Sequence, residues 1–132
     1  MPETYRVAIV GCGGMGGSHA RAWTSKERVE LVAVADVSQE SADRLGWEYS
    51  VSAFSDYRAM FEQEKPDIVS ITTWQNVRAE ITVAATESGV KGILGEKPMA
   101  ASSGESSDMI DACEQHGVKL AIGHQRRYVP QN

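Results

Sequence analysis

The fold of this chain is decided by residues 5–19, which read YRVAIVGCGGMGGSH. The apolar run from Arg6 to Val10 predicts a buried strand, and the segment from Gly14 to Trp23 predicts a helix. The turn between them follows the pattern Gly-x-Gly-x-x-Gly, which lets a backbone turn sharply, approach phosphate groups and pack a helix against a strand. The N–H groups of the first helical turn would face that anion. The residues predicted to hold a dinucleotide pyrophosphate are Gly11, Cys12, Gly13, Gly14, Met15 and Gly16.

A second apolar run, from Val29 to Ala35, predicts a strand that leads into Asp36, 20 residues beyond Gly16. At this separation an acidic side chain reaches the adenosine ribose and accepts hydrogen bonds from its hydroxyls. Its charge would repel a 2′-phosphate, so NAD is preferred, although Ser38 and Arg44 leave NADP as an alternative. A second interpretation of Asp36 is that it caps a helix beginning near Ser38.

The length and charge of the chain fit one domain without a nucleic-acid partner. At 132 residues, the chain is long enough to bury roughly two thirds of its unfolded surface around a single core. It carries 13 basic and 18 acidic residues, for a net charge of −5, and no basic stripe. General electrostatic binding of nucleic acid is therefore not expected, although a local phosphate site needs no net positive charge.

The two cysteines, Cys12 and Cys113, have no partner at CxxC or metal-ligand spacing. Neither a disulfide framework nor a metal site is predicted. Cys12 is interpreted as a supplier of a backbone N–H and a small side chain, with a redox-active thiol as the alternative. No apolar run approaches membrane-spanning length and no leader segment is recognised, so a soluble, cytoplasmic protein is predicted.

Strand-like and helical patterns alternate along the rest of the chain, which predicts a parallel sheet with helices on both faces. The further strands are expected at 47–52, 67–72, 91–95 and 118–123, and the further helices at 38–46, from Ser55 or Asp56 onward, at 76–88 and at 105–116. Six strands make a doubly wound α/β sheet of the Rossmann type in the order 3-2-1-4-5-6, with ligand at the carboxyl ends where the order reverses. Trp47, Phe54 and Phe61 are interpreted as core or edge packing.

The expected fifth strand runs into Gly95-Glu96-Lys97-Pro98, and the sixth into Gly123-His124-Gln125-Arg126-Arg127-Tyr128. With the glycine turn and Asp36, these residues resemble the N-terminal domain of the Gfo/Idh/MocA oxidoreductases, the family of glucose–fructose oxidoreductase and inositol dehydrogenase. The resemblance covers essentially the whole chain. It implies hydride transfer between a nicotinamide and a sugar, cyclitol or related secondary alcohol.

The resemblance also assigns Lys97 to the active centre, beside the nicotinamide and the substrate. There an ammonium group can stabilise a developing alkoxide or help to move a proton. The predicted cofactor-binding residues beyond the glycine turn are Asp36, Val37, Ser38, Thr72, Thr73, Trp74, Gln75, Glu96 and Lys97.

The loop after the expected fourth strand departs from the family pattern. Family members usually read Thr-Pro-Asn followed shortly by a histidine, and this chain has Trp74, Gln75 and Arg78 at the proline, asparagine and histidine positions. Trp74 is expected either to lie against the cofactor or to fill a gap beneath a neighbouring loop. Arg78 is interpreted as solvated, with a contact to a substrate carboxylate or phosphate as the alternative.

None of the three histidines is assigned to catalysis. His19 and His116 fall within expected helices, where a histidine commonly makes a local hydrogen bond or complements the helix dipole. His124 follows the sixth strand and borders the expected cleft, but nothing in the sequence supports it as a general base.

The expected domain organisation is a dinucleotide-binding Rossmann domain at 1–123, with 124–132 beginning the crossing to a second α/β domain that is absent from the chain. The resemblance places the acid/base element and most substrate contacts in that second domain, so a truncated module, inactive by itself, is expected. Self-association through the surface left open is also expected. Two alternatives are a stand-alone nucleotide-binding sensor and an NAD-dependent family member with hydrolase- or lyase-type chemistry.

Overall fold

The computed structural model describes residues 4–96 and 102–123. The strands are β1 (Tyr5–Val10), β2 (Val29–Ala35), β3 (Ser52–Phe54), β4 (Ile68–Ile71), β5 (Gly92–Glu96) and β6 (Lys119–Gly123). The helices are α1 (Gly14–Thr24), α2 (Gln39–Tyr49), α3 (Tyr57–Glu64), α4 (Gln75–Glu87) and α5 (Ser103–His116). Strands and helices alternate along the chain, as the sequence predicts.

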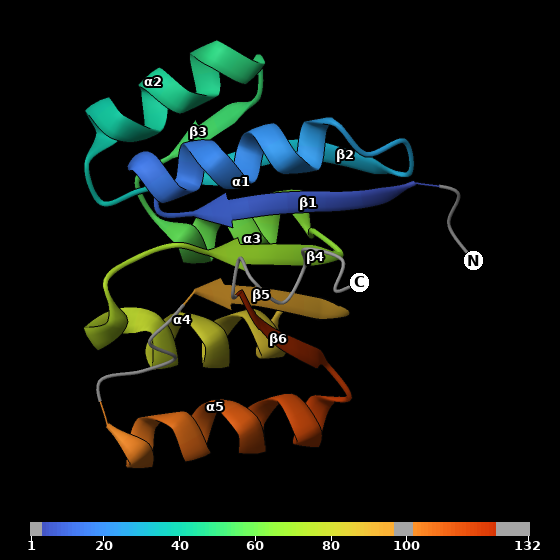
Figure 1. The fold of residues 1–132 in the computed structure, drawn as a ribbon, viewed down its shortest axis with the longest axis vertical. Coiled ribbons are helices and arrows are strands. Elements are labelled where there is room, and N and C mark those ends of the chain that lie inside the picture. Colours follow the sequence, from blue (N-terminus) through green and yellow to red (C-terminus); the bar gives the residue numbers. More distant parts are fainter. Residues whose placement is uncertain (1–3, 97–101, 124–132) are drawn as a thin grey trace, which may run out of the picture.

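The six strands form one parallel sheet in the order β3-β2-β1-β4-β5-β6 (Figure 1). The predicted doubly wound topology is therefore confirmed. The central strand β1 pairs with β2 on one side and with β4 on the other. The strand order consequently reverses beside β1, and the glycine turn leaves the sheet at that point.

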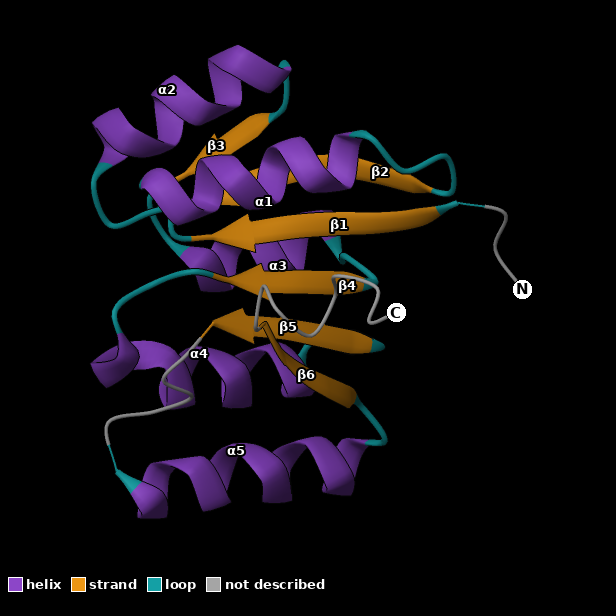
Figure 2. Cartoon of the chain, in the orientation of Figure 1, coloured by secondary structure: helices purple, strands orange, loops and turns teal. Residues whose placement is uncertain are grey.

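Alternate side chains of β1 face two separate cores. Val7 and Ile9 belong to the core that α1 and α2 cover, whereas Ala8 and Val10 belong to the core that α3, α4 and α5 cover. All four side chains are at most 3% exposed. In Figure 2, α1 lies in front of the central strands and α3 lies behind them. Burial on both faces explains why the strands are continuous apolar runs, and helices on both faces of the sheet are confirmed.

The third strand differs from its expected position. Helix α2 does not end at Gly46 but continues to Tyr49, where Ser50 closes it in a left-handed conformation with φ of 57°. The strand then begins at Ser52. Gly46 is a close-packing position, since a Cβ there would lie 2.9 Å from the carbonyl oxygen of Val51. Gly46 is therefore required by packing, and its prediction as the end of the helix is wrong.

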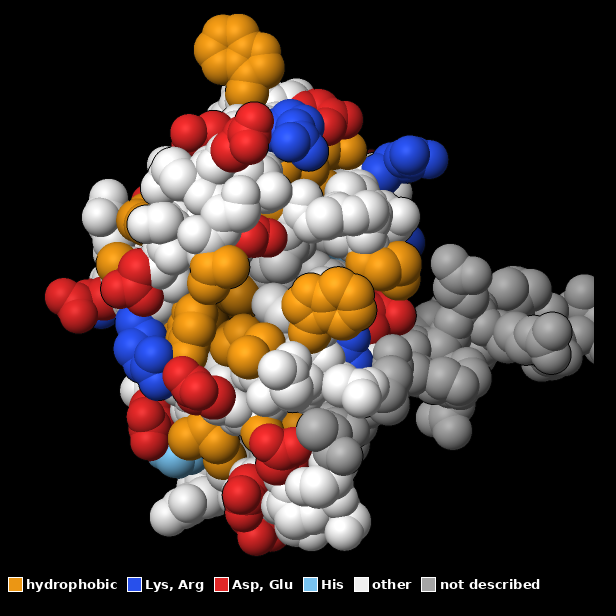
Figure 3. All heavy atoms as spheres, turned by 90° about the vertical axis from the view of Figure 1, so that its left-hand side faces the viewer, with side chains coloured by type: hydrophobic (Ala, Val, Ile, Leu, Met, Phe, Trp, Pro, Cys, Tyr) orange, Lys and Arg blue, Asp and Glu red, His pale blue; other side chains and the backbone are white. Residues whose placement is uncertain are grey.

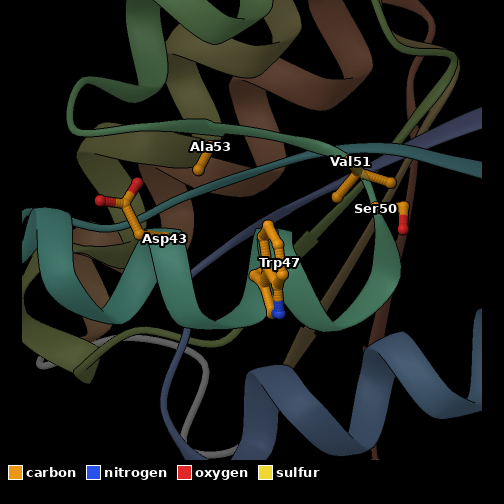
Figure 4. Close-up of a pocket in the computed structure, with 6 residues that line it drawn as sticks. Asp43, Trp47, Ser50, Val51 and Ala53 are labelled. Atoms are coloured by element: carbon orange, nitrogen blue, oxygen red, sulfur yellow. The ribbon is translucent and has the colours of Figure 1, made fainter.

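This shift places Trp47 on the outer side of α2, where it is 88% exposed. The interpretation of Trp47 as a packing residue is wrong, whereas Phe61 is 2% exposed and Phe54 packs against the same core. Trp47 lines a hollow of about 500 Å³ at the β3 edge of the sheet. Figure 4 shows its side chain together with others that line this hollow. The hollow is lined by Asp43, Gly46, Trp47, Ser50, Val51 and Ala53. None of the described helices is long and apolar enough to cross a membrane.

Candidate dinucleotide-binding site

The glycine turn follows β1 and is shaped by two close approaches. Gly11 has a φ of 106°, which L side chains rarely adopt, and a Cβ there would lie 2.8 Å from the carbonyl oxygen of Thr72. A Cβ on Gly16 would overlap the carbonyl oxygen of Gly11. These two glycines therefore let α1 start directly against the end of the sheet. Gly13 differs, because no described atom lies within 4 Å of the position that its Cβ would take.

The first turn of α1 faces this open space. Gly13 is the N-cap residue, and within the described part of the chain no side chain caps the helix. The first turn also contains no acidic residue. Since helix N-termini carry unpaired N–H groups and a partial positive charge, this end of α1 suits an anionic ligand.

Thr72 holds the turn from the side of β4. Its hydroxyl donates to the carbonyl oxygen of Gly11 at 2.7 Å, and its main-chain N–H donates to Val10 at 2.8 Å. Thr72 is a predicted cofactor contact, but its hydroxyl proton is thus donated to a carbonyl oxygen of the protein itself. Thr73 makes a local contact instead, from its hydroxyl to the carbonyl oxygen of Trp74 at 3.3 Å.

Asp36 lies at the end of β2 beside the same turn. Its Oδ2 accepts the main-chain N–H of Cys12 at 2.8 Å, and its Oδ1 accepts that of Ser38 at 2.8 Å. Ser38 itself is the N-cap of α2, and its hydroxyl accepts the N–H of Ser41. The interpretation of Asp36 as the helix cap is therefore wrong. Each carboxylate oxygen keeps a further lone pair for an external donor.

Cys12 is held in the turn with its thiol turned inward. It is 6% exposed, and its Sγ donates to the carbonyl oxygen of Ala35 at 3.3 Å. Burial, together with the negative charge of Asp36, raises the pKa of this thiol to about 12. The thiol is consequently protonated at neutral pH and is a poor nucleophile.

Exposed apolar side chains gather at the carboxyl ends of the strands. Figure 3 looks onto this end of the sheet, the side toward which β1, β4 and β5 point in Figure 1, and hydrophobic side chains lie near its middle. Met15, Val37 and Trp74 are 40%, 92% and 84% exposed and follow β1, β2 and β4, respectively. At 84% exposure Trp74 does not fill a gap beneath a loop, so that alternative is wrong. Gln75, the first residue of α4, is also exposed.

Arg78 is buried rather than solvated, being 7% exposed. Its Nε donates to the carbonyl oxygen of Thr73 at 2.9 Å, and its Nη1 donates to that of Glu96 at 2.6 Å. Burial lowers the pKa of Arg78, and the negative charge of Glu96 opposes this change. The sequence interpretation was wrong, although the spacing of Arg78 from the buried Ile81 and Thr82 places it on the inner face of α4.

The carboxylate of Glu96 contacts a histidine that lies on the face of the sheet opposite to Arg78. Nε2 of His19, in α1, lies 2.6 Å from Oε2 of Glu96, and His19 is 8% exposed. The expectation of a local contact for His19 is therefore wrong, whereas Nδ1 of His116 lies 3.0 Å from the carbonyl oxygen of Ala112 in its own helix. His19 falls at helical spacing from Gly16, which was the available signal for its burial.

The predicted catalytic residue Lys97 directly follows Glu96 and lies outside the described residues, as does the segment 124–132 that includes His124. The role of Lys97 therefore stays a prediction. Among residues 4–96 and 102–123, no group of three or more His, Cys, Asp and Glu side chains could hold a metal ion.

The sheet topology, the glycine turn and the placement of Asp36 together define a dinucleotide-binding domain of the Rossmann type. The chain belongs to the Gfo/Idh/MocA family, described as an oxidoreductase family with an NAD-binding Rossmann fold, whose model matches residues 5–124. The resemblance seen in the sequence is thereby confirmed.

Individual relatives support this assignment. The chain is 29% identical to D-apiose dehydrogenase of Paraburkholderia graminis, over 97% of this chain and 34% of that protein. It is 30% identical to inositol 2-dehydrogenase of Salmonella typhimurium, over 95% of this chain and 38% of that protein. The structure of the WlbA dehydrogenase from Bordetella pertussis, in complex with NADH and UDP-GlcNAcA, matches with a TM-score of 0.90 and 26% identity, over 96% of this chain and 38% of that one. The chain thus spans roughly a third of the length of these relatives.

Proposed function

We propose that this chain is the cofactor-binding module of an oxidoreductase that transfers hydride between NAD and a sugar, cyclitol or related secondary alcohol. The observation that carries this proposal is the carboxylate of Asp36, fixed by the N–H groups of Cys12 and Ser38 beside the glycine turn. Bound NAD supplies the nicotinamide ring that accepts or donates the hydride.

The residues of the turn fit the phosphates of such a cofactor. The space outside Gly13 is open, and the N-terminus of α1 has no side-chain cap among the described residues. We assign the pyrophosphate to this place, because the N–H groups there can bind oxygen atoms without a nearby carboxylate in the first turn of α1. Met15, Val37 and Trp74 supply exposed apolar surface for the flat rings of the cofactor.

The preference for NAD over NADP rests on Asp36. Two main-chain hydrogen bonds, each 2.8 Å long, hold its carboxylate, so the negative charge cannot turn away without breaking them. A ribose with both hydroxyls free can donate to such a carboxylate, whereas a 2′-phosphate would be repelled by it.

The substrate class is inferred from the relatives and from Lys97. The names of two relatives specify D-apiose and inositol, which are a sugar and a cyclitol. Lys97 is assigned the movement of the hydroxyl proton, because an ammonium group can stabilise an alkoxide. The remaining substrate contacts are assigned to a second α/β domain following residue 123, in keeping with relatives of which this chain covers 34% and 38%.

Calorimetric titration with NAD⁺, NADH and NADP⁺ tests the cofactor assignment. We expect saturable binding of NAD⁺, with NADP⁺ at least about tenfold weaker, which is about 1.4 kcal/mol. Asp36→Ser removes the charge and should bring the affinities for NAD⁺ and NADP⁺ within about threefold of each other. The matched control is Asp67→Ser, because Asp67 likewise accepts a main-chain N–H, that of Arg6 in β1, but lies just before β4.

The results of these titrations distinguish the proposed binding of NAD from the proposed preference for NAD over NADP. A folded chain that binds neither NAD⁺ nor NADH would contradict the proposal. Equal affinities for NAD⁺ and NADP⁺ in the unchanged protein would contradict only the preference assigned to Asp36. In Asp67→Ser the ratio of the two affinities should stay as in the unchanged protein.

A further inference from the structure

Three charged or ionisable side chains from three different elements meet at the end of β5. Nε2 of His19, in α1, lies 2.6 Å from Oε2 of Glu96. Nη1 of Arg78, in α4, donates to the carbonyl oxygen of Glu96 at 2.6 Å. The side chains of His19 and Glu96 are 9% and 19% exposed, and Arg78 as a residue is 7% exposed. We call these three residues the β5 clamp.

The β5 clamp holds one residue from both faces of the sheet. Helix α1 covers one face and α4 covers the other, so His19 reaches the Glu96 carboxylate from one side and Arg78 reaches its carbonyl oxygen from the other. Nε of Arg78 also donates to the carbonyl oxygen of Thr73 at 2.9 Å, just beyond β4. The carboxyl ends of β4 and β5 are thereby fixed to each other and to α1.

Each hydrogen bond of the β5 clamp has a defined donor and a defined acceptor. An ionised carboxylate only accepts, so Nε2 of His19 donates to Glu96, and Nδ1 of His19 is buried with no partner among the described residues. The guanidinium of Arg78 presents several N–H groups in a rigid fork, and two of them reach carbonyl oxygens on neighbouring strand ends. Burying such groups costs free energy even when they are paired, so they are poor stabilisers compared with apolar side chains of similar volume.

The position of the clamp relates it to one half of the cofactor. A doubly wound sheet binds the two mononucleotide halves of a dinucleotide on either side of the point where the strand order reverses. Asp36 is assigned to the half over β1 and β2, whereas the clamp lies at the ends of β4 and β5. We propose that His19, Arg78 and Glu96 are positioning residues that set the geometry of the nicotinamide half of the site. This inference rests on the proposed function, since it takes NAD as the ligand at this edge.

A comparison of NAD⁺ with ADP-ribose, which lacks the nicotinamide, tests the inference. Arg78→Lys keeps the positive charge, but an ammonium group cannot reproduce the fork that spans Thr73 and Glu96. His19→Phe keeps a ring and removes the hydrogen bond to Glu96. For both variants we expect a loss of about tenfold in NAD⁺ affinity, with ADP-ribose affinity within about twofold of the unchanged chain.

A further variant controls for effects on the fold. Arg58→Lys alters an exposed arginine of α3, which pairs with Glu80 at 3.5 Å, and should change neither affinity. Thermal unfolding of every variant shows whether it is folded at the titration temperature, and if His19→Phe is not, Arg78→Lys decides.

The ratio of the two affinities separates positioning from stability. Equal losses for NAD⁺ and ADP-ribose in Arg78→Lys, or no loss for either, would overturn the inference while leaving the proposed function intact. Failure of the unchanged, folded chain to bind both ligands would instead overturn the proposed function and the inference with it.

Discussion

The main-chain N–H of Cys12 lies 2.8 Å from Oδ2 of Asp36, and this hydrogen bond joins the glycine turn to the residue that follows β2. The same carboxylate acts on the Cys12 side chain, because its negative charge adds to burial in raising the pKa of the thiol. The Sγ of Cys12 is in turn bonded to the carbonyl oxygen of Ala35, at the end of β2. The turn and the end of β2 are therefore joined through both the main chain and the side chain of Cys12.

The stability of the protein should fall at alkaline pH partly through Cys12. Folding raises the pKa of this thiol from 9.0 to about 12, so between these values the unfolded chain loses a proton that the folded chain keeps. The free energy of unfolding then decreases as pH rises, by at most about 1.4 kcal/mol per pH unit from this group. Urea unfolding from about pH 8 to about pH 10.5 should show a shallower decline for Cys12→Ser than for the unchanged protein. Identical declines would contradict the burial of an un-ionised thiol.

Gly16→Ala should damage the fold itself. The added methyl group would overlap the carbonyl oxygen of Gly11 and lie 3.4 Å from Oγ1 of Thr72, so α1 must move away from the turn. We expect a loss of about 1–3 kcal/mol or more in urea unfolding. Gly17→Ala is the matched control, because no described atom lies within 4 Å of its Cβ position. That control should be neutral or stabilising by up to about 1 kcal/mol, and an equal loss in both variants would contradict the packing argument.

Gly13→Ala should weaken cofactor binding and leave the stability of the fold nearly unchanged. Its φ of −81° suits alanine, and the new methyl group would project into space without described neighbours. Stability should stay within about 0.5 kcal/mol of the original, while NAD⁺ affinity falls at least about tenfold, because the methyl group occupies the approach of the phosphates. Calorimetry and thermal unfolding measure the two effects. Unchanged affinity would show that the phosphates do not approach the backbone at Gly13.

Ser70→Ala should show how much a buried hydrogen bond between β4 and α1 contributes to the free energy of unfolding. Ser70 is 0% exposed, and its Oγ accepts the indole N–H of Trp23 at 2.6 Å. The alanine leaves that N–H without its acceptor, which should cost about 1–3 kcal/mol of unfolding free energy. In the background Trp23→Phe, where the donor is already absent, the same change should cost clearly less. Equal costs in both backgrounds would mean that the two side chains are not coupled.

Trp74→Ala should weaken cofactor binding without affecting stability. Trp74 and Trp47 are 84% and 88% exposed, but Trp74 follows β4 at the cofactor edge, whereas Trp47 lies on α2. Loss of ring stacking should reduce NADH affinity by about 0.5–1.5 kcal/mol in Trp74→Ala and should leave it unchanged in Trp47→Ala. Titration of both variants with NADH makes the comparison, and an equal effect at Trp47 would contradict the placement of the ligand.

The parts of the site that could be predicted are those defined by residues at fixed, short spacings in the sequence. Gly11 and Gly16 sit at fixed offsets after an apolar strand, and Asp36 ends the next one, so spacing alone indicates their roles. The long-range contacts of Arg78 and His19 were not predicted, because an arginine on a helix is ordinarily solvated and a histidine there commonly bonds within its own helix. Each is buried only because Glu96, far away in sequence, ends a strand beside it.

The sequence by itself determined the alternation of strands and helices and the location of the glycine turn, because hydrophobic periodicity and glycine spacing are properties of short segments. The strand order was predicted from this alternation only through the regular topology of doubly wound sheets. Only the tertiary structure decided that α2 continues past Gly46, that Trp47 and Trp74 are exposed, and which partners the buried polar groups find. Those outcomes depend on which atoms approach across the sheet, as when Val51 and Ala53 pack against Gly46. A contact between segments that are distant in the chain leaves no periodic signal in either of them, so it becomes visible only when both are in place.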